Sequence, residues 1–191
     1  AEVQELLRDP EEIRHLPRLL ADYGIRLLVV EPLPRTKIDG ACFWMNQKAP
    51  VIALALRYDR IDYFWHTVTH ELGHVMNEDG AIDFDLLEKN GHMSDERPDS
   101  ERQADTFATE TLVPQRELDG FVTRVRPLYS SKRILGFSAR VGVHPGIVVG
   151  QLQHREEISY SQHRKFLSPV RGVITDAALT DGWHNTLPVA L

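Results

Sequence analysis

Five consecutive residues, His70-Glu71-Leu72-Gly73-His74, constrain this chain more than any other segment. Side chains at positions i and i+4 share one face of an α-helix, so two histidines at this spacing can reach one metal ion only if the segment is helical. A helix from about residue 61 to residue 77, capped by Asp59 or Asp62, is predicted around the motif. Glu71 then projects one step round from the two rings, within reach of a water on the ion but not placed to ligate beside them.

A second predicted helix offers the third ligand. Glu101-Arg102-Gln103-Ala104-Asp105 places two carboxylates at i and i+4 of a helix that Ser100 caps and Pro114 ends. A catalytic zinc takes three protein ligands and keeps one position open, so Glu101 is the candidate third ligand. Asp105 can accept a hydrogen bond from the far nitrogen of a ligating histidine and fix its orientation.

The predicted centre therefore has His70, His74 and Glu101 as ligands, with Glu71 as base. Zn²⁺ suits two imidazoles and one carboxylate, and Mn²⁺ is the alternative. Zinc lowers the pKa of its water to about 7, and a carboxylate completes the removal of the proton.

Each feature also has a plainer interpretation. The motif can be two surface histidines flanking a solvated Glu, and the two carboxylates are typical of a solvated helix face. His66, at i−4 from the first ligand, can extend the row of imidazoles but fits packing or capping better. Three further residues are candidate donors to the oxyanion, and nothing in the sequence chooses among them: Tyr58, His92 and His144. Gly73 costs a helix about 1 kcal/mol, which a close approach by another segment would justify.

The order of the remaining elements predicts an α+β domain, with a small sheet early and helices late. Residues 3–23 read as helix broken near Pro10 and Pro17, and 78–98 as a loop. Strands are predicted at 25–30, 41–45 and 51–56. Further helices are predicted at 115–125, 131–141, 145–153 and near 159–166.

We expect one domain over 1–191: a catalytic core at 24–114, a helical part at 115–168 and an irregular tail at 169–191. Residues 137–153 have the spacing of a helix-turn-helix, for which the alternative is a helical hairpin packed on the core.

Composition narrows the class of function. A net charge of −6 argues against a chain that acts as a nucleic-acid clamp, although it leaves room for a small local basic patch. A lone cysteine, Cys42, fits a reducing compartment, and neither a signal peptide nor a membrane-spanning stretch is evident, so a cytoplasmic location is expected.

Together these motifs resemble the ImmA/IrrE family of bacterial zinc metallopeptidases. That family pairs an H-E-x-x-H helix with a later helix of the form E-x-x-A-[DN]-x-F-A ending at Leu-x-Pro, here 51–77 and 101–114. The similarity extends to 36–41 and 142–153, and covers roughly residues 20–168.

The resemblance implies a zincin-like fold, His70, His74 and Glu101 as ligands, and Glu71 as base. It also implies cleavage of a protein partner, usually a helix-turn-helix transcriptional repressor, in stress response or in toxin–antitoxin and mobile-element regulation. The closest pattern is the peptidase part of regulators with an N-terminal helix-turn-helix of the XRE type. Nothing before Tyr23 resembles such a domain, so either it has been separated from this chain or this member stands alone.

Two other functions compete with the peptidase. One is a DNA-binding or protein-binding regulator built on residues 137–153, although direct nucleic-acid binding by this chain alone is not expected. The other is a regulatory metal site closed by a fourth ligand such as His66 or His92. For the peptidase, the strand at 51–56 would take the substrate as an added strand if it lay at a sheet edge.

Overall fold

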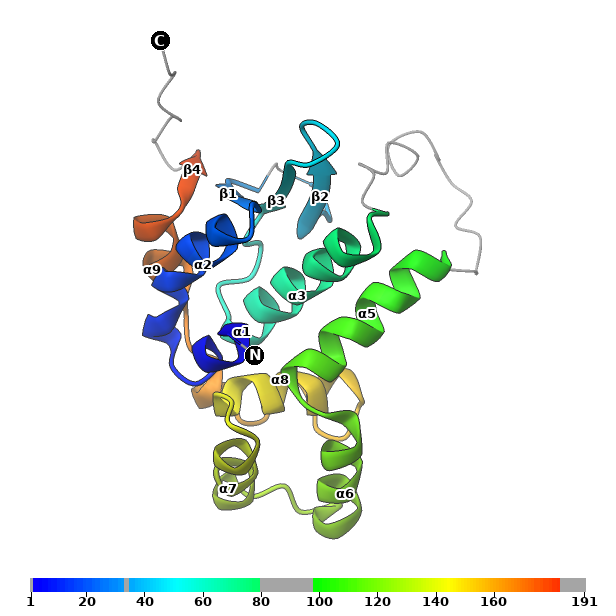
Figure 1. Ribbon diagram of the computed structural model, residues 1–191. Coiled ribbons are helices and arrows are strands. Elements are labelled where there is room, and N and C mark those ends of the chain that lie inside the picture. The colour runs from blue at the N-terminus through cyan, green and yellow to red at the C-terminus, as the bar shows by residue number, and fades with distance from the viewer. Residues whose placement is uncertain (1, 33–34, 80–97, 183–191) are drawn as a thin grey trace.

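The computed structural model describes residues 2–32, 35–79 and 98–182 (Figure 1). Its sheet has four strands in the order β2-β3-β1-β4: β1 (Arg26–Val30), β2 (Gly40–Trp44), β3 (Pro50–Leu54) and β4 (Leu179–Asp181). β1 lies parallel to both β3 and β4, whereas β2 at one edge is antiparallel to β3. A small mixed sheet with a mostly helical second half confirms the predicted α+β class.

The N-terminal helices break where the sequence places its prolines. They are α1 (Glu2–Leu6), the 3-10 helix η1 (Pro10–His15) and α2 (Leu16–Asp22). Proline lacks a backbone N–H, so it is tolerated only in the first turn of a helix, which is where Pro10 and Pro17 lie. Gly24 then turns the chain into β1 with a left-handed φ of +77°.

The motif helix, α3 (Ile61–Asn77), has the predicted bounds and packs against β2 and β3 (Figure 1). Phe64, Trp65 and Val68 face the core and are almost fully buried. The predicted caps are wrong, because the N-cap is Arg60 and makes no side-chain cap hydrogen bond. Asp59 instead accepts two 2.7 Å hydrogen bonds from backbone N–H groups at residues 170 and 171, and Asp62 pairs with Arg60.

The second motif helix, α5 (Asp99–Leu112), runs alongside α3 (Figure 1). Its N-cap is Pro98, so the predicted capping role of Ser100 is wrong: the helix begins two residues earlier than predicted and places Ser100 inside its first turn. As predicted, the helix ends before Pro114.

The remaining helices are α6 (Gln115–Val125), α7 (Ser131–Val141), α8 (Pro145–His154), the 3-10 turn η2 (Arg164–Phe166) and α9 (Arg171–Ala177). The helix predicted near 159–166 is therefore only one short turn. The expectation of an irregular tail is also wrong for residues 171–181, which form α9 and β4. Their order comes from tertiary contacts that a periodicity search does not detect: β4 pairs with β1, and Asp59 caps α9.

Within the described part of the chain, every helix is too short or too polar to span a lipid bilayer.

Candidate metal centre

The two motif histidines point their outer nitrogens at one point beside α3. The Nε2 atoms of His70 and His74 lie 3.2 Å apart. From the neighbouring helix, Glu101 places Oε2 3.4 Å from Nε2 of His70 and Oε1 3.4 Å from Nε2 of His74. The three residues predicted from the sequence as ligands, on two helices, thus lie together with their donor atoms facing one another.

The spacing of these atoms suits a metal ion. Zinc bonds of about 2.0–2.2 Å arranged as a tetrahedron separate the ligand atoms by about 3.3–3.5 Å, and the separations here are 3.2 and 3.4 Å. Two nitrogens and one carboxylate oxygen form a donor set that zinc accepts readily. Among the described residues, His70, His74 and Glu101 form a group of three that can hold a metal ion. Three protein ligands leave the fourth position of a zinc ion open.

The close approach of α3 and α5 depends on Gly73. A Cβ at this position would lie 3.1 Å from the Cα of Ala104 and 3.4 Å from both its Cβ and the ring of Phe107. The packing partner of Gly73 is therefore backbone, which cannot move aside as a flexible side chain can. This contact supplies the reason for a glycine inside an otherwise regular helix, as the sequence suggested.

A carboxylate sits behind each imidazole. Nδ1 of His70 lies 2.9 Å from Oδ1 of Asp105, the residue that the sequence nominates for this place. Nδ1 of His74 lies 2.9 Å from Oδ1 of Asp79, which sequence reasoning missed. Such contacts fix which ring nitrogen faces the metal and how the ring is turned.

Asp79 reaches His74 through the way α3 ends. Glu78 adopts a left-handed conformation with φ of 55°, and the N–H groups of residues 78 and 79 return to the carbonyls of Val75 and His74. This turn folds Asp79 back under the last helical turn. The available sequence signal was the polar run Asn77-Glu78-Asp79 after the second histidine.

The surroundings of His70 favour a proton on its ring. Burial lowers the pKa of His70, but hydrogen bonds to Asp105 and Glu101 outweigh it and raise this pKa to about 9. At neutral pH the ring of His70 therefore carries a positive charge that a metal ion would replace.

Glu71 lies in a protected place between α3 and β2. It is 6% exposed, and burial raises its pKa to about 7, against the opposing effect of the two histidines. Gly40 of β2 makes the space, since a Cβ there would lie 2.7 Å from Oε1 of Glu71 and 2.6 Å from the methyl carbon of Thr67. A carboxyl group with a pKa near the working pH can both accept and return a proton.

The weaker candidates fall elsewhere. His66 lies 3.8 Å from Oδ1 of Asp105, and these two residues form with His70 a second group that can hold a metal ion. The ring of Tyr58 packs at a tilt against Tyr63, which lies two turns of α3 before the motif, with 4.5 Å between ring centroids. His144 caps α8 by accepting from the N–H of Gly146. His92 lies outside the described residues.

The segment with helix-turn-helix spacing forms α7 and α8, and α8 packs against α3. Six of its ten residues are buried, including Val148, Val149 and Leu152. Gly150 fits directly against Asp62 of α3, where a Cβ would lie 2.5 Å from the carboxylate. This is the helical hairpin packed on the core; it does not leave α8 free to enter a DNA groove.

The fold and the site define an α+β protein with a candidate metal centre on an H-E-x-x-H helix. Comparison with known families adds that the model of the IrrE N-terminal-like domain, Peptidase_M78, matches residues 21–160. The match covers well over half of the chain, so the protein belongs to this family, and the family supports a peptidase. A search of curated proteins and a search of solved structures each gave no significant match.

Proposed function

We propose that this chain is a zinc-dependent endopeptidase with a zincin-like catalytic core. The observation that carries the proposal is the convergence of three donor atoms from two helices, 3.2 to 3.4 Å apart, beside a buried glutamate. Membership of a peptidase family supports the same conclusion.

In this proposal His70, His74 and Glu101 hold Zn²⁺, with Mn²⁺ as the alternative, and Asp105 and Asp79 keep the two rings in position. The ion, when bound, polarises the scissile carbonyl and lowers the pKa of the attacking water. His70, Glu71 and His74 all lie on α3, so the helix holds two of the proposed ligands and the proposed base in a fixed relation to one another.

Glu71 moves the proton. Its carboxylate takes a proton from the attacking water and later delivers it to the nitrogen of the leaving amine. Burial raises the pKa of its carboxyl group above the ordinary value, which favours a group that can both accept and return a proton. Because it is buried against β2, bulk water competes little for the same proton.

Strand β2 is where we place the substrate backbone. The segment 51–56, predicted to pair with the substrate, forms β3. This strand has neighbours on both sides and cannot accept another strand, so the prediction is wrong. β2 is an edge strand, and its Gly40 touches Glu71. An extended peptide paired with β2 would thus pass directly beside the proposed base.

We further propose that the substrate is a specific protein partner, a helix-turn-helix transcriptional repressor, in stress response or in toxin–antitoxin or mobile-element regulation. The support for this assignment is the family membership and the motifs in the sequence. Repressors encoded beside the gene are the first candidates to incubate with the purified protein.

Replacing Glu71 with Gln tests the assignment. The variant should retain bound zinc, because Glu71 is not a proposed ligand, and should cleave at least about 100-fold more slowly, the scale of a lost general base. Glu5→Gln, an exposed change on α1, is the matched control and should cleave as the wild type does. Loss of zinc from the Glu71 variant, or undiminished cleavage by it, would contradict the proposed roles.

A further inference from the structure

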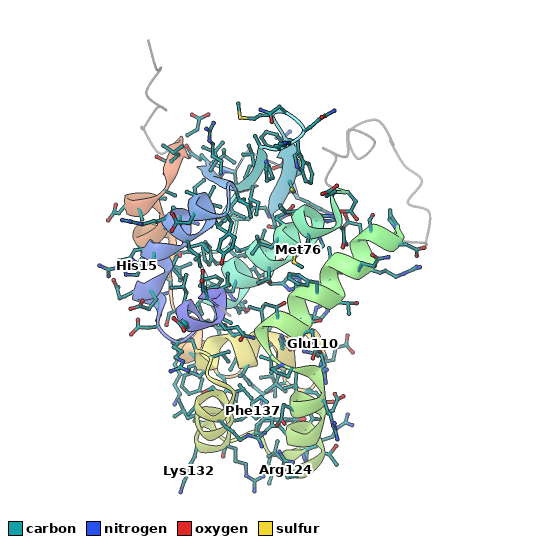
Figure 2. All side chains as sticks on the ribbon, in the orientation of Figure 1. His15, Met76, Glu110, Arg124, Lys132 and Phe137 are labelled. Atoms are coloured by element: carbon teal, nitrogen blue, oxygen red, sulfur yellow. The ribbon has the colours of Figure 1, made fainter. Side chains whose placement is uncertain are left out.

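The loop end of α6 and α7 gathers positive charge on an otherwise acidic chain. Residues 115–141 contain six Lys or Arg and two acidic residues, whereas residues 1–114 contain 12 basic and 22 acidic residues. Arg124 and Lys132 mark the end of the two helices farthest from the sheet (Figure 2). We call the surface formed by Arg124, Arg126, Leu128, Lys132, Arg133 and Leu135 the basic tip.

Three of the four cations of the basic tip are not neutralised within the described chain. Arg124, Lys132 and Arg133 are exposed and make no ion pair among the described residues. Arg133 only donates to the carbonyl of Leu128, at 3.4 Å. Arg126 pairs with Glu157 at 3.3 Å yet keeps a largely exposed side chain.

Apolar side chains stand among these charges. Leu128 is 72% exposed and Leu135 is 46% exposed. Lys132, Leu135, Gly136 and Ala139 follow the i, i+3, i+4, i+7 spacing along α7, and all four are exposed. Gly136 has nothing within 4 Å of the place a Cβ would occupy, so the face is shallow and open. Exposed leucines beside small residues and cations are typical of a surface that receives an amphipathic helix.

We propose that the basic tip binds an acidic amphipathic helix of a protein partner. Leucines of that helix would pack on Leu128, Leu135 and the shallow face of α7, and its flanking carboxylates would meet Lys132 and Arg133. A nucleic acid fits less well, because its phosphates gain nothing from the exposed leucines that stand among the cations.

This docking does not depend on peptidase activity. The basic tip lies at the far end of the molecule from β2 and from the ends of α3 and α5 that carry the candidate metal centre (Figure 1). A partner could therefore be held there while the free edge of β2 stays accessible.

Fluorescence anisotropy with a labelled synthetic peptide tests the proposal. The probe is a helix-forming peptide of about 18 residues with Leu along one face and Glu on both flanks. The full chain should bind it at low salt. The Lys132→Glu/Arg133→Glu variant should bind at least about tenfold more weakly, and Leu135→Ser about fivefold more weakly. Lys48→Glu, in the exposed turn between β2 and β3, reverses one charge away from the basic tip and should bind as the wild type does.

Two further probes decide the kind of partner. A peptide with Lys in place of each Glu should not bind, and a duplex DNA of about 20 base pairs should neither bind comparably nor displace the acidic peptide. Failure of the wild type to bind the acidic peptide would overturn the proposal, as would equal weakening by Lys48→Glu or tighter binding of the duplex. Circular dichroism of each variant checks that the substitutions, all on exposed positions, leave the fold intact.

Discussion

Replacing Gly73 with Ala should weaken metal binding although it removes no ligand. The added Cβ would lie 3.1 Å from the Cα of Ala104 and 3.4 Å from Phe107, closer than ordinary carbon contacts of about 3.5–4.0 Å. The neighbour at 3.1 Å is backbone, so α5 must move away from α3 by about 0.5 Å to restore normal contact. Glu101 is carried on α5 and would move with it.

The size of this effect follows from the tolerance of the centre. Metal–ligand distances vary by only about 0.2 Å in a working site, so a 0.5 Å shift of one helix leaves Glu101 too far from the two rings. We expect zinc affinity to fall about 10- to 100-fold, the scale seen when the support of a ligand is disturbed. Stability receives two opposing contributions: helix propensity favours Ala by about 1 kcal/mol, and overpacking costs about 1–3 kcal/mol.

Gly136→Ala on α7 is the matched control. It is also inside a helix, but a Cβ there has nothing within 4 Å, so it should add up to about 1 kcal/mol of stability and leave zinc affinity unchanged. Urea unfolding of the metal-free proteins measures stability, and competition with a chelating dye measures zinc affinity. If Gly73→Ala binds zinc as tightly as Gly136→Ala does and is equally stabilised, the contact between α3 and α5 does not set the geometry of the centre.

Three other expectations concern the same centre. Zinc affinity of the wild type should rise about tenfold from pH 7 to pH 8 and about fivefold from pH 8 to pH 9, because the ring of His70 must lose the proton that its pKa of about 9 retains; a flat profile in chelator competition would exclude His70 as a ligand. Asp79→Asn should lower zinc affinity about 10- to 100-fold by releasing the ring of His74, whereas an unchanged affinity would mean that the contact has no role in binding. Gly40→Ala should slow cleavage by about 100-fold while zinc stays bound, because its Cβ displaces Glu71; loss of zinc instead would show that β2 supports the ligands rather than the base.

The contribution of each helix to the proposed ligand set could be predicted because the spacing within each helix is local. His70 and His74 lie one helical turn apart, and Glu101 and Asp105 repeat that spacing on α5, so helical geometry alone puts each pair on one face. The three strand segments and the helices at 61–77, 115–125 and 131–141 were predictable for the same reason, since each has its own periodicity or its own turn residues.

What the sequence could not supply depends on contacts between distant segments. Asp79 supports His74 only because Glu78 turns the chain back, and β4 is a strand only because β1 lies beside it. The choice of β2 over β3 as the edge strand likewise requires the strand order. Local patterns predict which residues share a face of one helix or strand, but not which other element packs beside that face.

His70 also affects the balance of charge at the candidate metal centre. Glu71, Glu101 and Asp105 gather in a small volume, and three carboxylates alone would repel one another. A proton on His70 places a positive charge between Glu101 and Asp105, where it contacts both. Because the pKa of His70 in the folded chain is raised above its ordinary value of 6.5, its contribution to stability is fully present below about pH 6.5 and is lost as pH rises through about 9. A metal ion bound there would supply positive charge at higher pH, so metal binding would exchange the proton on His70 for a cation.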